Sequence, residues 1–294
     1  MVSRVDAKGH ELRQMHPLSF ELARRMPSPR LVGLIQRMTG YRETAGGRFR
    51  QRETAALVVP LVISLGTPFR IALGRDPVVL ERQPSFAAGL YAGPVHIESD
   101  GHAECVQVDF TPLGAYRFLG GVVLDLVGRM VDIADVLGQE GRWLRDRLGA
   151  MARWDQRFDL VEKFVARRAV HVPSREVAFA YGRLAMAGGD TRIAAVAEEI
   201  GWSRKHLVRR FQAEIGLGPK SVARVMRFRQ ACRLAHAGGA GGWAMIAAEA
   251  GYADQAHLAR EFIALAGESP TVWARRMSLI DSRLAFPADA IEAW

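Results

Sequence analysis

Residues 251–262 read Gly-Tyr-Ala-Asp-Gln-Ala-His-Leu-Ala-Arg-Glu-Phe, and a related stretch, residues 201–211, stands about 50 positions earlier. In each stretch a glycine and an aromatic residue precede a leucine, an arginine and a phenylalanine in the same order. The matching positions are Val196, Ala197, Gly201, Trp202, Leu207, Arg209, Phe211, Gly216 and Pro219 in the first copy, and Ile246, Ala247, Gly251, Tyr252, Leu258, Arg260, Phe262, Gly267 and Pro270 in the second. The offset is 50 residues up to the aromatic residue and 51 after it, so the C-terminal third contains an internal repeat.

Each copy predicts two helices joined by a tight turn. In the first copy, apolar residues recur at i, i+3, i+4 and i+7 over residues 193–200, which is one face of a helix. Gly201 follows where a left-handed helix cap favours glycine. Ser203, and Asp254 in the second copy, can each cap the next helix by accepting from free backbone amides.

The second helix of each copy presents polar residues on the side away from its leucine and phenylalanine. These outward residues are Ser203, Arg204, Lys205, His206, Arg209 and Arg210 in the first copy, and Asp254, Gln255, Ala256, His257 and Arg260 in the second. An α-helix fits the major groove of DNA, and such side chains bond base edges or phosphates. A plain helical hairpin with a charged surface would explain one copy, but two copies favour a pair of DNA-binding helix-turn-helix motifs.

The stretch 220–236 between the copies contains no helix-breaking residue. As a helix it would rise roughly 25 Å, which is of the order needed to hold two recognition helices in successive major grooves about 34 Å apart.

Residues 183–276 resemble the DNA-binding domain of the AraC family of bacterial transcription regulators, and residues 251–262 with Gly267 and Pro270 are similar to that family's second signature. The resemblance implies an all-helical domain in which a long helix joins both motifs and the outward residues contact bases.

The chain also departs from the family pattern. Ile263 stands where members usually carry Lys or Arg, Gln212 takes the equivalent place in the first copy, and Ala253, Ala256 and Ala259 leave the second recognition helix poor in long polar side chains. We therefore expect the first motif to provide most of the affinity, since phosphate contacts set affinity while base contacts set sequence choice.

The N-terminal two thirds predict strands followed by helices. Candidate strands are residues 57–63, 69–73, 86–91, 95–98 and 105–110, and in the last of these Val106, Val108 and Phe110 alternate with Gln107 and Asp109 as in a half-buried strand. Thr111-Pro112 then begins a helix, with Thr as its cap. Several short strands without helices between them favour a small β-barrel or sandwich, and the predicted fold class is α+β.

Residues 110–120 and 131–138 are similar to the sensor half of certain AraC-type regulators, which implies a cupin-like barrel followed by helices over residues 158–168 and 176–186. The expected organisation is a β-rich sensor or dimerisation domain over residues 1–155, a helical linker over 156–189 ending at Gly188-Gly189, a double helix-turn-helix domain over 190–276 and a tail over 277–294.

The sequence offers little for catalysis or metal binding. His96, His102, Glu104 and Cys105 have ligand chemistry, but their spacing matches no metal template, so we predict no metal and no cofactor. No nucleophile elbow, zinc-protease helix or dinucleotide fingerprint occurs, so we predict no enzyme. Phe86, Tyr91 and Phe110 could line a ligand-binding barrel mouth or be plain core, and the ligand-binding residues stay unassigned.

Composition restricts the class of protein. The chain has 294 residues with a net charge of +9, which suits two globular domains. Basic residues are concentrated at both ends: residues 1–52 carry a net charge of +7, and residues 183–276, with fourteen Lys and Arg against eight Asp and Glu, carry +6. Two cysteines, Cys105 and Cys232, cannot form a disulfide scaffold and suit a reducing compartment. Residues 1–13 lack the apolar run of a signal peptide, and the longest apolar stretch, 55–66, is too short to span a membrane, so we expect a cytoplasmic protein.

The sequence therefore predicts a sequence-specific transcription regulator of the AraC type. Its expected partners are double-stranded DNA, a small-molecule effector sensed by the N-terminal domain, a second copy of the chain in a homodimer, and RNA polymerase if it activates. An enzyme with a fused DNA-binding domain, a non-specific architectural binder, and an activator whose front domain only dimerises stay open as alternatives.

Overall fold

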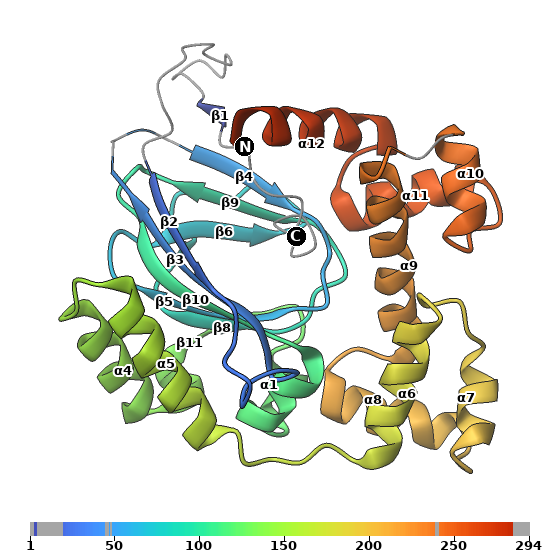
Figure 1. Ribbon diagram of the computed structural model, residues 1–294, viewed down its shortest axis with the longest axis horizontal. Coiled ribbons are helices and arrows are strands. Elements are labelled where there is room, and N and C mark those ends of the chain that lie inside the picture. The colour runs from blue at the N-terminus through green and yellow to red at the C-terminus, as the bar shows by residue number, and fades with distance from the viewer. Residues whose placement is uncertain (1–2, 5–19, 45–46, 48, 239–240, 285–294) are drawn as a thin grey trace.

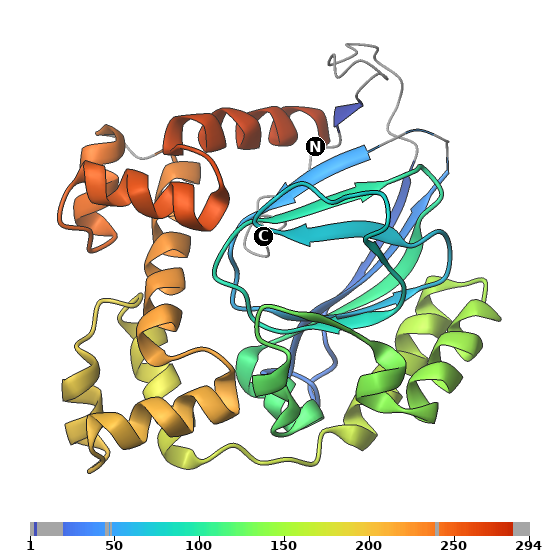
Figure 2. The same ribbon diagram turned by 180° about the vertical axis from the view of Figure 1, so that it is seen from behind.

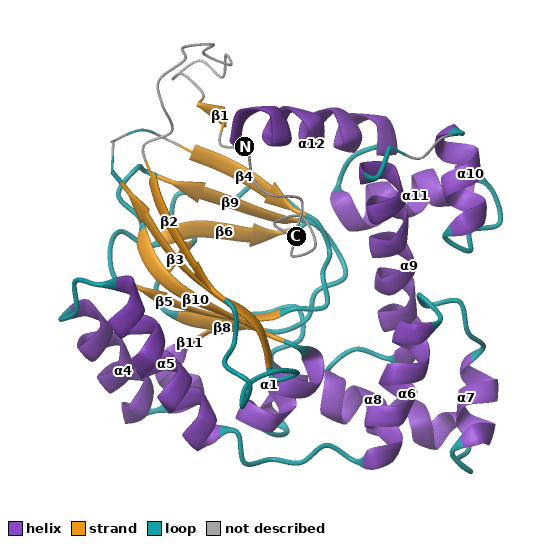
Figure 3. Cartoon of the chain, viewed as in Figure 1, coloured by secondary structure: helices purple, strands orange, loops and turns teal. Residues whose placement is uncertain are grey.

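The computed structural model describes residues 3–4, 20–44, 47, 49–238 and 241–284. Ten strands come first in the described chain, helices follow from residue 112, and one further strand, residues 130–132, lies among the first helices (Figure 3). After residue 132 the described elements are all helices. The predicted α+β class, with a β-rich N-terminal half and an all-helical C-terminal domain, is confirmed. The part of the predicted tail beyond residue 284, and residues 1–2, 5–19, 45–46 and 48 of the basic stretch 1–52, lie outside the described residues.

Two antiparallel sheets face one another and form an open barrel (Figure 1). One sheet has the order β1 (Ser3–Arg4), β4 (Phe49–Glu53), β9 (Val95–Ser99), β6 (Phe69–Leu73) and β7 (Arg82–Gln83). The other has the order β11 (Met130–Asp132), β8 (Phe86–Ala88), β5 (Val59–Ser64), β10 (Glu104–Phe110), β3 (Ile35–Glu43) and β2 (Phe20–Arg25). The barrel predicted from the short strands is thus built from both sheets.

Strands β2, β3 and β4 lie before residue 57, where no strand was predicted. Strand β4 reads Phe-Arg-Gln-Arg-Glu, and such a polar run gives no apolar alternation to detect. The predicted strand over residues 86–91 is shorter than expected, because β8 ends at Ala88.

Strand β10 is covered on both faces, so its prediction as a half-buried strand was wrong. Val106, Val108 and Phe110 enter the main apolar core. The opposite face lines the barrel interior, where Asp109 is only 1% exposed and accepts a hydrogen bond from Arg37 Nε at 2.7 Å. A buried carboxylate that is paired in this way alternates with apolar residues in the sequence just as a solvent-facing carboxylate does, so the sequence does not distinguish the two.

Helices cover the outer face of the six-stranded sheet. They are α1 (Pro112–Leu119), α2 (Val122–Asp125), α3 (Ile133–Leu137), α4 (Gln139–Gly149) and α5 (Trp154–Arg168). As predicted, Thr111 caps α1, its Oγ1 accepting from the Gly114 amide at 2.9 Å. The Trp154 ring fixes α5 to the sheet, since a Cβ added at Gly40 of β3 would lie 2.3 Å from that ring.

The C-terminal helices form a separate group beside the barrel (Figure 2). They are α6 (Arg175–Met186), α7 (Ile193–Glu199), α8 (Arg204–Ile215), α9 (Pro219–His236), α10 (Gly242–Glu249), α11 (Gln255–Ala266) and α12 (Pro270–Leu284). Helix α6 packs against α7, α8 and α9, whereas α5 packs against α4. The segment 156–189 therefore divides between the two groups, and α12 runs across residue 276.

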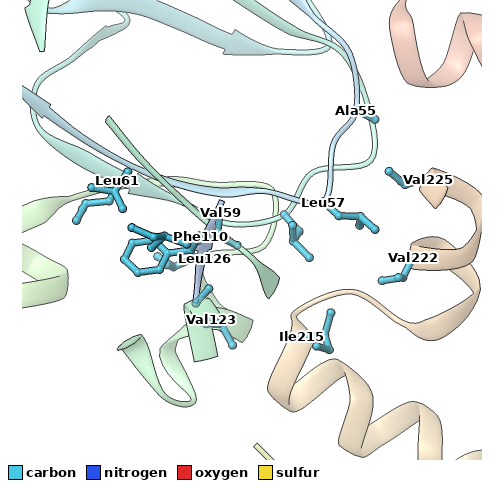
Figure 4. Close-up of a cluster of buried hydrophobic side chains, with 14 of the residues drawn as sticks. Ala55, Leu57, Val59, Leu61, Phe110, Val123, Leu126, Ile215, Val222 and Val225 are labelled. Atoms are coloured by element: carbon cyan, nitrogen blue, oxygen red, sulfur yellow. The ribbon is translucent and has the colours of Figure 1, made fainter. Parts of the chain in front are cut away.

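One apolar core joins the barrel to the C-terminal helices (Figure 4). Leu57, from the loop before β5, lies across from Val222 and Val225 of α9. The Ala55 amide donates to the Leu265 carbonyl of α11 at 2.8 Å. Because these contacts reach both α9 and α11, the position of the helical group depends on the barrel.

No helix in the part of the chain that the structure describes is long and apolar enough to cross a bilayer. Cys105 and Cys232 are free thiols.

Candidate nucleic-acid interface

The first helix-turn-helix joins α7 to α8 through a left-handed glycine. Gly201 has φ +70°, and the amides of Gly201 and Trp202 donate to the carbonyls of Glu198 and Ala197 at 3.0 and 2.9 Å. These two bonds form the Schellman motif that ends a helix at glycine. Ser203 Oγ then accepts from the His206 amide at 3.2 Å, which confirms the predicted cap of α8.

The second copy has the same geometry between α10 and α11. Gly251 has φ +75°, and the amides of Gly251 and Tyr252 donate to the carbonyls of Ala248 and Ala247 at 3.2 and 2.8 Å. Asp254 Oδ1 accepts from the His257 amide at 2.6 Å, so this predicted cap is also confirmed. The sequence repeat is therefore a repeat of backbone structure.

A pair of ring contacts repeats as well, and no sequence argument identified it. Trp202 and His206 make an edge contact with centroids 4.5 Å apart at 89°. Tyr252 and His257 make the same contact at 5.2 Å and 89°. Each histidine therefore packs on the aromatic residue of its own turn, and both histidines are half-buried. The available signal in the sequence was that each copy has a histidine four or five residues after its aromatic residue.

The other predicted outward residues of both recognition helices reach solvent. The exposed ones are Ser203, Arg204, Lys205, Arg209, Arg210, Asp254, Gln255, Ala256 and Arg260. The leucine and phenylalanine of each copy, by contrast, are fully buried. The repeat thus brings two solvent-facing helical surfaces of similar geometry to one helical group.

Arg210 differs from its neighbours because it holds a buried carboxylate. Its Nη2 lies 2.7 Å from Oε1 of Glu214, which is 1% exposed. Glu214 also accepts from the backbone amide of Ser174 at 2.7 Å and from its hydroxyl at 3.0 Å. Glu214 therefore fixes α8 to the start of α6, and Arg210 pairs with that carboxylate from within α8. The position of Arg210 on the predicted outward face did not suggest this role.

The two recognition helices differ in charge. Helix α8 begins with Arg204 and Lys205, where α11 has Gln255 and Ala256. The second-copy equivalent of Arg210 is Glu261, which forms an ion pair with Arg224 of α9 at 2.6 Å. The outward surface of α8 is consequently strongly cationic, while that of α11 is close to neutral.

Helix α9 separates the two motifs, which lie at its two ends (Figure 1). It contains 18 residues, close to the length predicted, and rises about 27 Å at 1.5 Å per residue. Pro219 begins α9 and Pro270 begins α12, so the final proline of each copy also has one role.

A second candidate site is a cavity of about 350 Å³ between the barrel and the C-terminal helices. Its walls are the inward faces of both sheets, α9 and α12; from α9 come Phe228, Arg229, Cys232 and Arg233. Of the three residues predicted for a barrel mouth, Phe86 and Tyr91 line the cavity, whereas Phe110 lies in the core against Phe118 at 4.8 Å. No sequence argument identified the contribution of α9 and α12, because they lie far from the strands in sequence.

The residues with metal-ligand chemistry do not meet as a set. His96 Nδ1 lies 2.7 Å from Asp76, and Glu104 accepts from Arg42 and Arg157 at 2.9 and 2.5 Å. Cys105 faces the cavity, where burial raises the pKa of its thiol to about 12. Within the described ranges no group of three or more His, Cys, Asp and Glu side chains is arranged to hold a metal ion.

Comparisons with known proteins find similarity to helix-turn-helix proteins. Residues 196–276 match a family model described as a helix-turn-helix domain, and no curated protein matches the chain. The C-terminal domain of AraT, a response regulator from Geobacillus stearothermophilus, is 24% identical, with a TM-score of 0.34 over 35% of this chain and 87% of that one. ToxT from Vibrio cholerae is 10% identical, with a TM-score of 0.44 over 87% of this chain and 97% of that one. The AraC-like transcriptional activator CuxR is 14% identical, with a TM-score of 0.28 over 72% of this chain and 87% of that one.

The repeat, its two capped glycine turns and the family match lead to one assignment: residues 196–276 form a helix-turn-helix domain that contains two copies of the motif.

Proposed function

We propose that this protein is a sequence-specific transcription regulator in which α8 and α11 enter successive major grooves of DNA. The observation that carries the proposal is the repeated geometry: two recognition helices with the same caps and turns, at the two ends of α9. The contact residues are the eleven predicted from the sequence. Arg204, Lys205 and Arg209 are exposed cations suited to phosphates and guanine, and Gln255 is an exposed amide suited to adenine.

Selection of bound sequences from a random DNA pool at moderate salt, with the full chain, tests this proposal. We expect one site with two half-elements about one helical turn apart, or about 10 base pairs. Binding without enrichment of any sequence would favour an architectural role instead. Enrichment of a single short element would mean that α11 only supports α8.

Substitution of Lys205 tests whether the first motif provides most of the affinity for DNA. Because α8 carries the cationic surface, Lys205→Ala is expected to weaken binding to the selected site roughly tenfold and to reduce the slope of log K against log salt by about 1. Fluorescence anisotropy across a salt series measures both quantities. Arg145→Ala is the matched control, since Arg145 is an exposed cation on α4, and we expect it to change neither. An unchanged salt slope for Lys205→Ala would contradict the phosphate contact.

We further propose that the cavity binds a small-molecule effector. Its walls come both from the barrel and from α9, the helix that joins the motifs. A ligand touching both would favour one arrangement of the two parts, and such differential affinity is what a regulatory signal requires. In this proposal, residues 1–155 bind the effector and residues 190–276 bind DNA. A homodimer, and contact with RNA polymerase in the case of activation, belong to the same proposal.

Filling the cavity tests the effector role. Ala88 of β8 lines the cavity, so Ala88→Phe is expected to abolish the response of a reporter driven by the selected site to active compounds. The DNA affinity of the purified variant should stay within about twofold of wild type, since Ala88 is on the barrel and is none of the outward residues of α8 and α11. A full effector response in Ala88→Phe would place the effector elsewhere.

A further inference from the structure

Glu53 faces the cavity from the last position of β4. Phe49, Gln51 and Glu53 alternate along this strand and all line the cavity. Glu53 stands opposite Val95 in the register between β4 and β9, and Val95 lines the cavity too. The surrounding wall is largely apolar and includes Phe69, Ile71, Phe86 and Ile97. Apolar side chains therefore shield the carboxyl group of Glu53 from bulk water on several sides.

The neighbouring charges leave Glu53 without a cation of its own. Arg37 of β3 donates to Oδ2 of Asp109 on β10 at 2.7 Å, and Gln107 donates to Oδ1 of the same carboxylate at 2.7 Å. Glu53 receives only a long hydrogen bond from Gln51, at 3.4 Å. Among the described residues no Lys, Arg or His forms an ion pair with Glu53. Arg37 thus neutralises Asp109, and Glu53 remains as an additional carboxyl group.

Burial raises the pKa of Glu53 to about 7, the nearby Asp109 carboxylate raises it further, and Arg37 opposes both. The other charged groups that line the cavity are Arg24, Glu43, Arg50, Arg52 and Arg129 in the barrel part, Arg229 and Arg233 of α9, and Arg276 of α12. Arg50 pairs with Glu98, and Arg52 and Arg276 pair with Glu268 at 3.6 and 2.6 Å. Near neutral pH, a large fraction of Glu53 is therefore a neutral acid with an O–H to donate.

We propose that the cavity binds an apolar molecule carrying a hydrogen-bond-accepting oxygen, and that Glu53, as a neutral carboxyl group, donates a hydrogen bond to that oxygen. The apolar walls select the skeleton of the ligand, and Glu53 selects its polar group. A cationic ligand has no equivalent partner, because the other carboxylates that line the cavity already have partners: Asp109 accepts from Arg37 and Gln107, and Glu43 accepts from Tyr41, Ser99 and the Ala103 amide. The charged residues that α9 and α12 contribute to the cavity wall are all arginines. This inference rests on the proposed effector role of the cavity.

Calorimetric titration of the full chain with three matched probes tests the inference. Octan-2-one and octane-1-sulfonate carry acceptor oxygens and do not titrate between pH 6 and 8, whereas octyltrimethylammonium carries a cation. With a pKa of about 7, the neutral fraction of Glu53 falls about tenfold from pH 6 to pH 8. We therefore expect both acceptor probes to bind about tenfold tighter at pH 6, and the ammonium probe to show no such gain.

Glu53→Gln separates this role from a structural one. Its amide still donates a hydrogen bond but does not titrate, so the acceptor probes should bind with an affinity that is independent of pH. Asp125→Asn removes an exposed carboxylate on α2 and should retain the tenfold dependence. Thermal unfolding confirms that each variant is folded.

Three results would overturn the inference: the wild-type pH profile in Glu53→Gln, tightest binding of the ammonium probe, or no binding of any probe. None of them bears on DNA recognition, which the selection experiment measures on its own.

Discussion

Phe262→Ala is expected to lower the free energy of unfolding by about 3–5 kcal/mol and to abolish binding to the selected DNA site. Phe262 of α11 is fully buried. Its ring meets Phe228 of α9 at 4.9 Å, Trp243 of α10 at 5.5 Å and Trp273 of α12 at 5.6 Å, all near edge-to-face. Such aromatic pairs add about 0.5–1.5 kcal/mol each to the effect of burial. One side chain therefore holds four helices together, and its loss leaves a cavity at their junction.

Ile263→Ala is the matched control, since it removes an apolar side chain from the next position of the same helix. Ile263 is 59% exposed, so we expect a loss of stability below about 1 kcal/mol. Urea unfolding followed by tryptophan fluorescence reports on both variants, because Trp243 and Trp273 contact the altered site. Equal losses of stability in the two variants would show that Phe262 does not belong to a packed core in the second motif.

Glu214→Ala is expected to cost about 1–3 kcal/mol, the range for leaving a poorly solvated hydrogen-bond donor without its acceptor. The substitution leaves the Ser174 amide at the start of α6 and the Arg210 guanidinium without their acceptor. The Ser174 amide loses the acceptor that ties it to α8, so the start of α6 should loosen against α8. Because α8 is the cationic recognition helix, DNA affinity should fall together with stability.

Glu199→Ala tests whether the loss of stability expected for Glu214→Ala is caused by the burial of Glu214. Glu199 also pairs with an arginine, Arg183, at 2.9 Å, but both side chains are about 40% exposed. Exposed pairs contribute about 0.2–1 kcal/mol, so we expect a small effect on the urea midpoint. If the two glutamate variants unfold alike, the Glu214 network contributes no more than a surface pair.

Arg210→Ala then distinguishes the two roles of this residue. A contact with phosphate predicts a lower salt slope in DNA binding, and the pairing with Glu214 predicts a loss of stability without DNA present. Helix α8 offers Lys205 for comparison, which is exposed and should affect only the DNA experiment.

The helix-turn-helix repeat could be predicted from the sequence because its determinants are local. A glycine at Gly201 or Gly251 gives a left-handed turn, and a Ser or Asp two or three positions later caps the next helix. The 3.6-residue period decides which side chains are buried. Each of these effects acts within one or two helical turns, so it can be recognised in the sequence alone. The exposure of Arg204 and Gln255 followed from the same local rules.

The barrel interior and the cavity could not be predicted in this way. Arg37 and Asp109 are 72 positions apart, and Ser174 and Glu214 are 40 apart, yet each pair makes a buried polar contact. In the sequence, such residues have the pattern of solvent-facing residues, which is why β3 and β4 were not predicted and why Asp109 was expected to face solvent. The sequence by itself determined two capped, amphipathic helix-turn-helix motifs, since hydrogen bonds and apolar periodicity along a helix are short-range. Only the tertiary structure decided what the polar residues inside the barrel meet, because closing two sheets and docking α9 on them brings together charges whose pKa values and partners depend on burial.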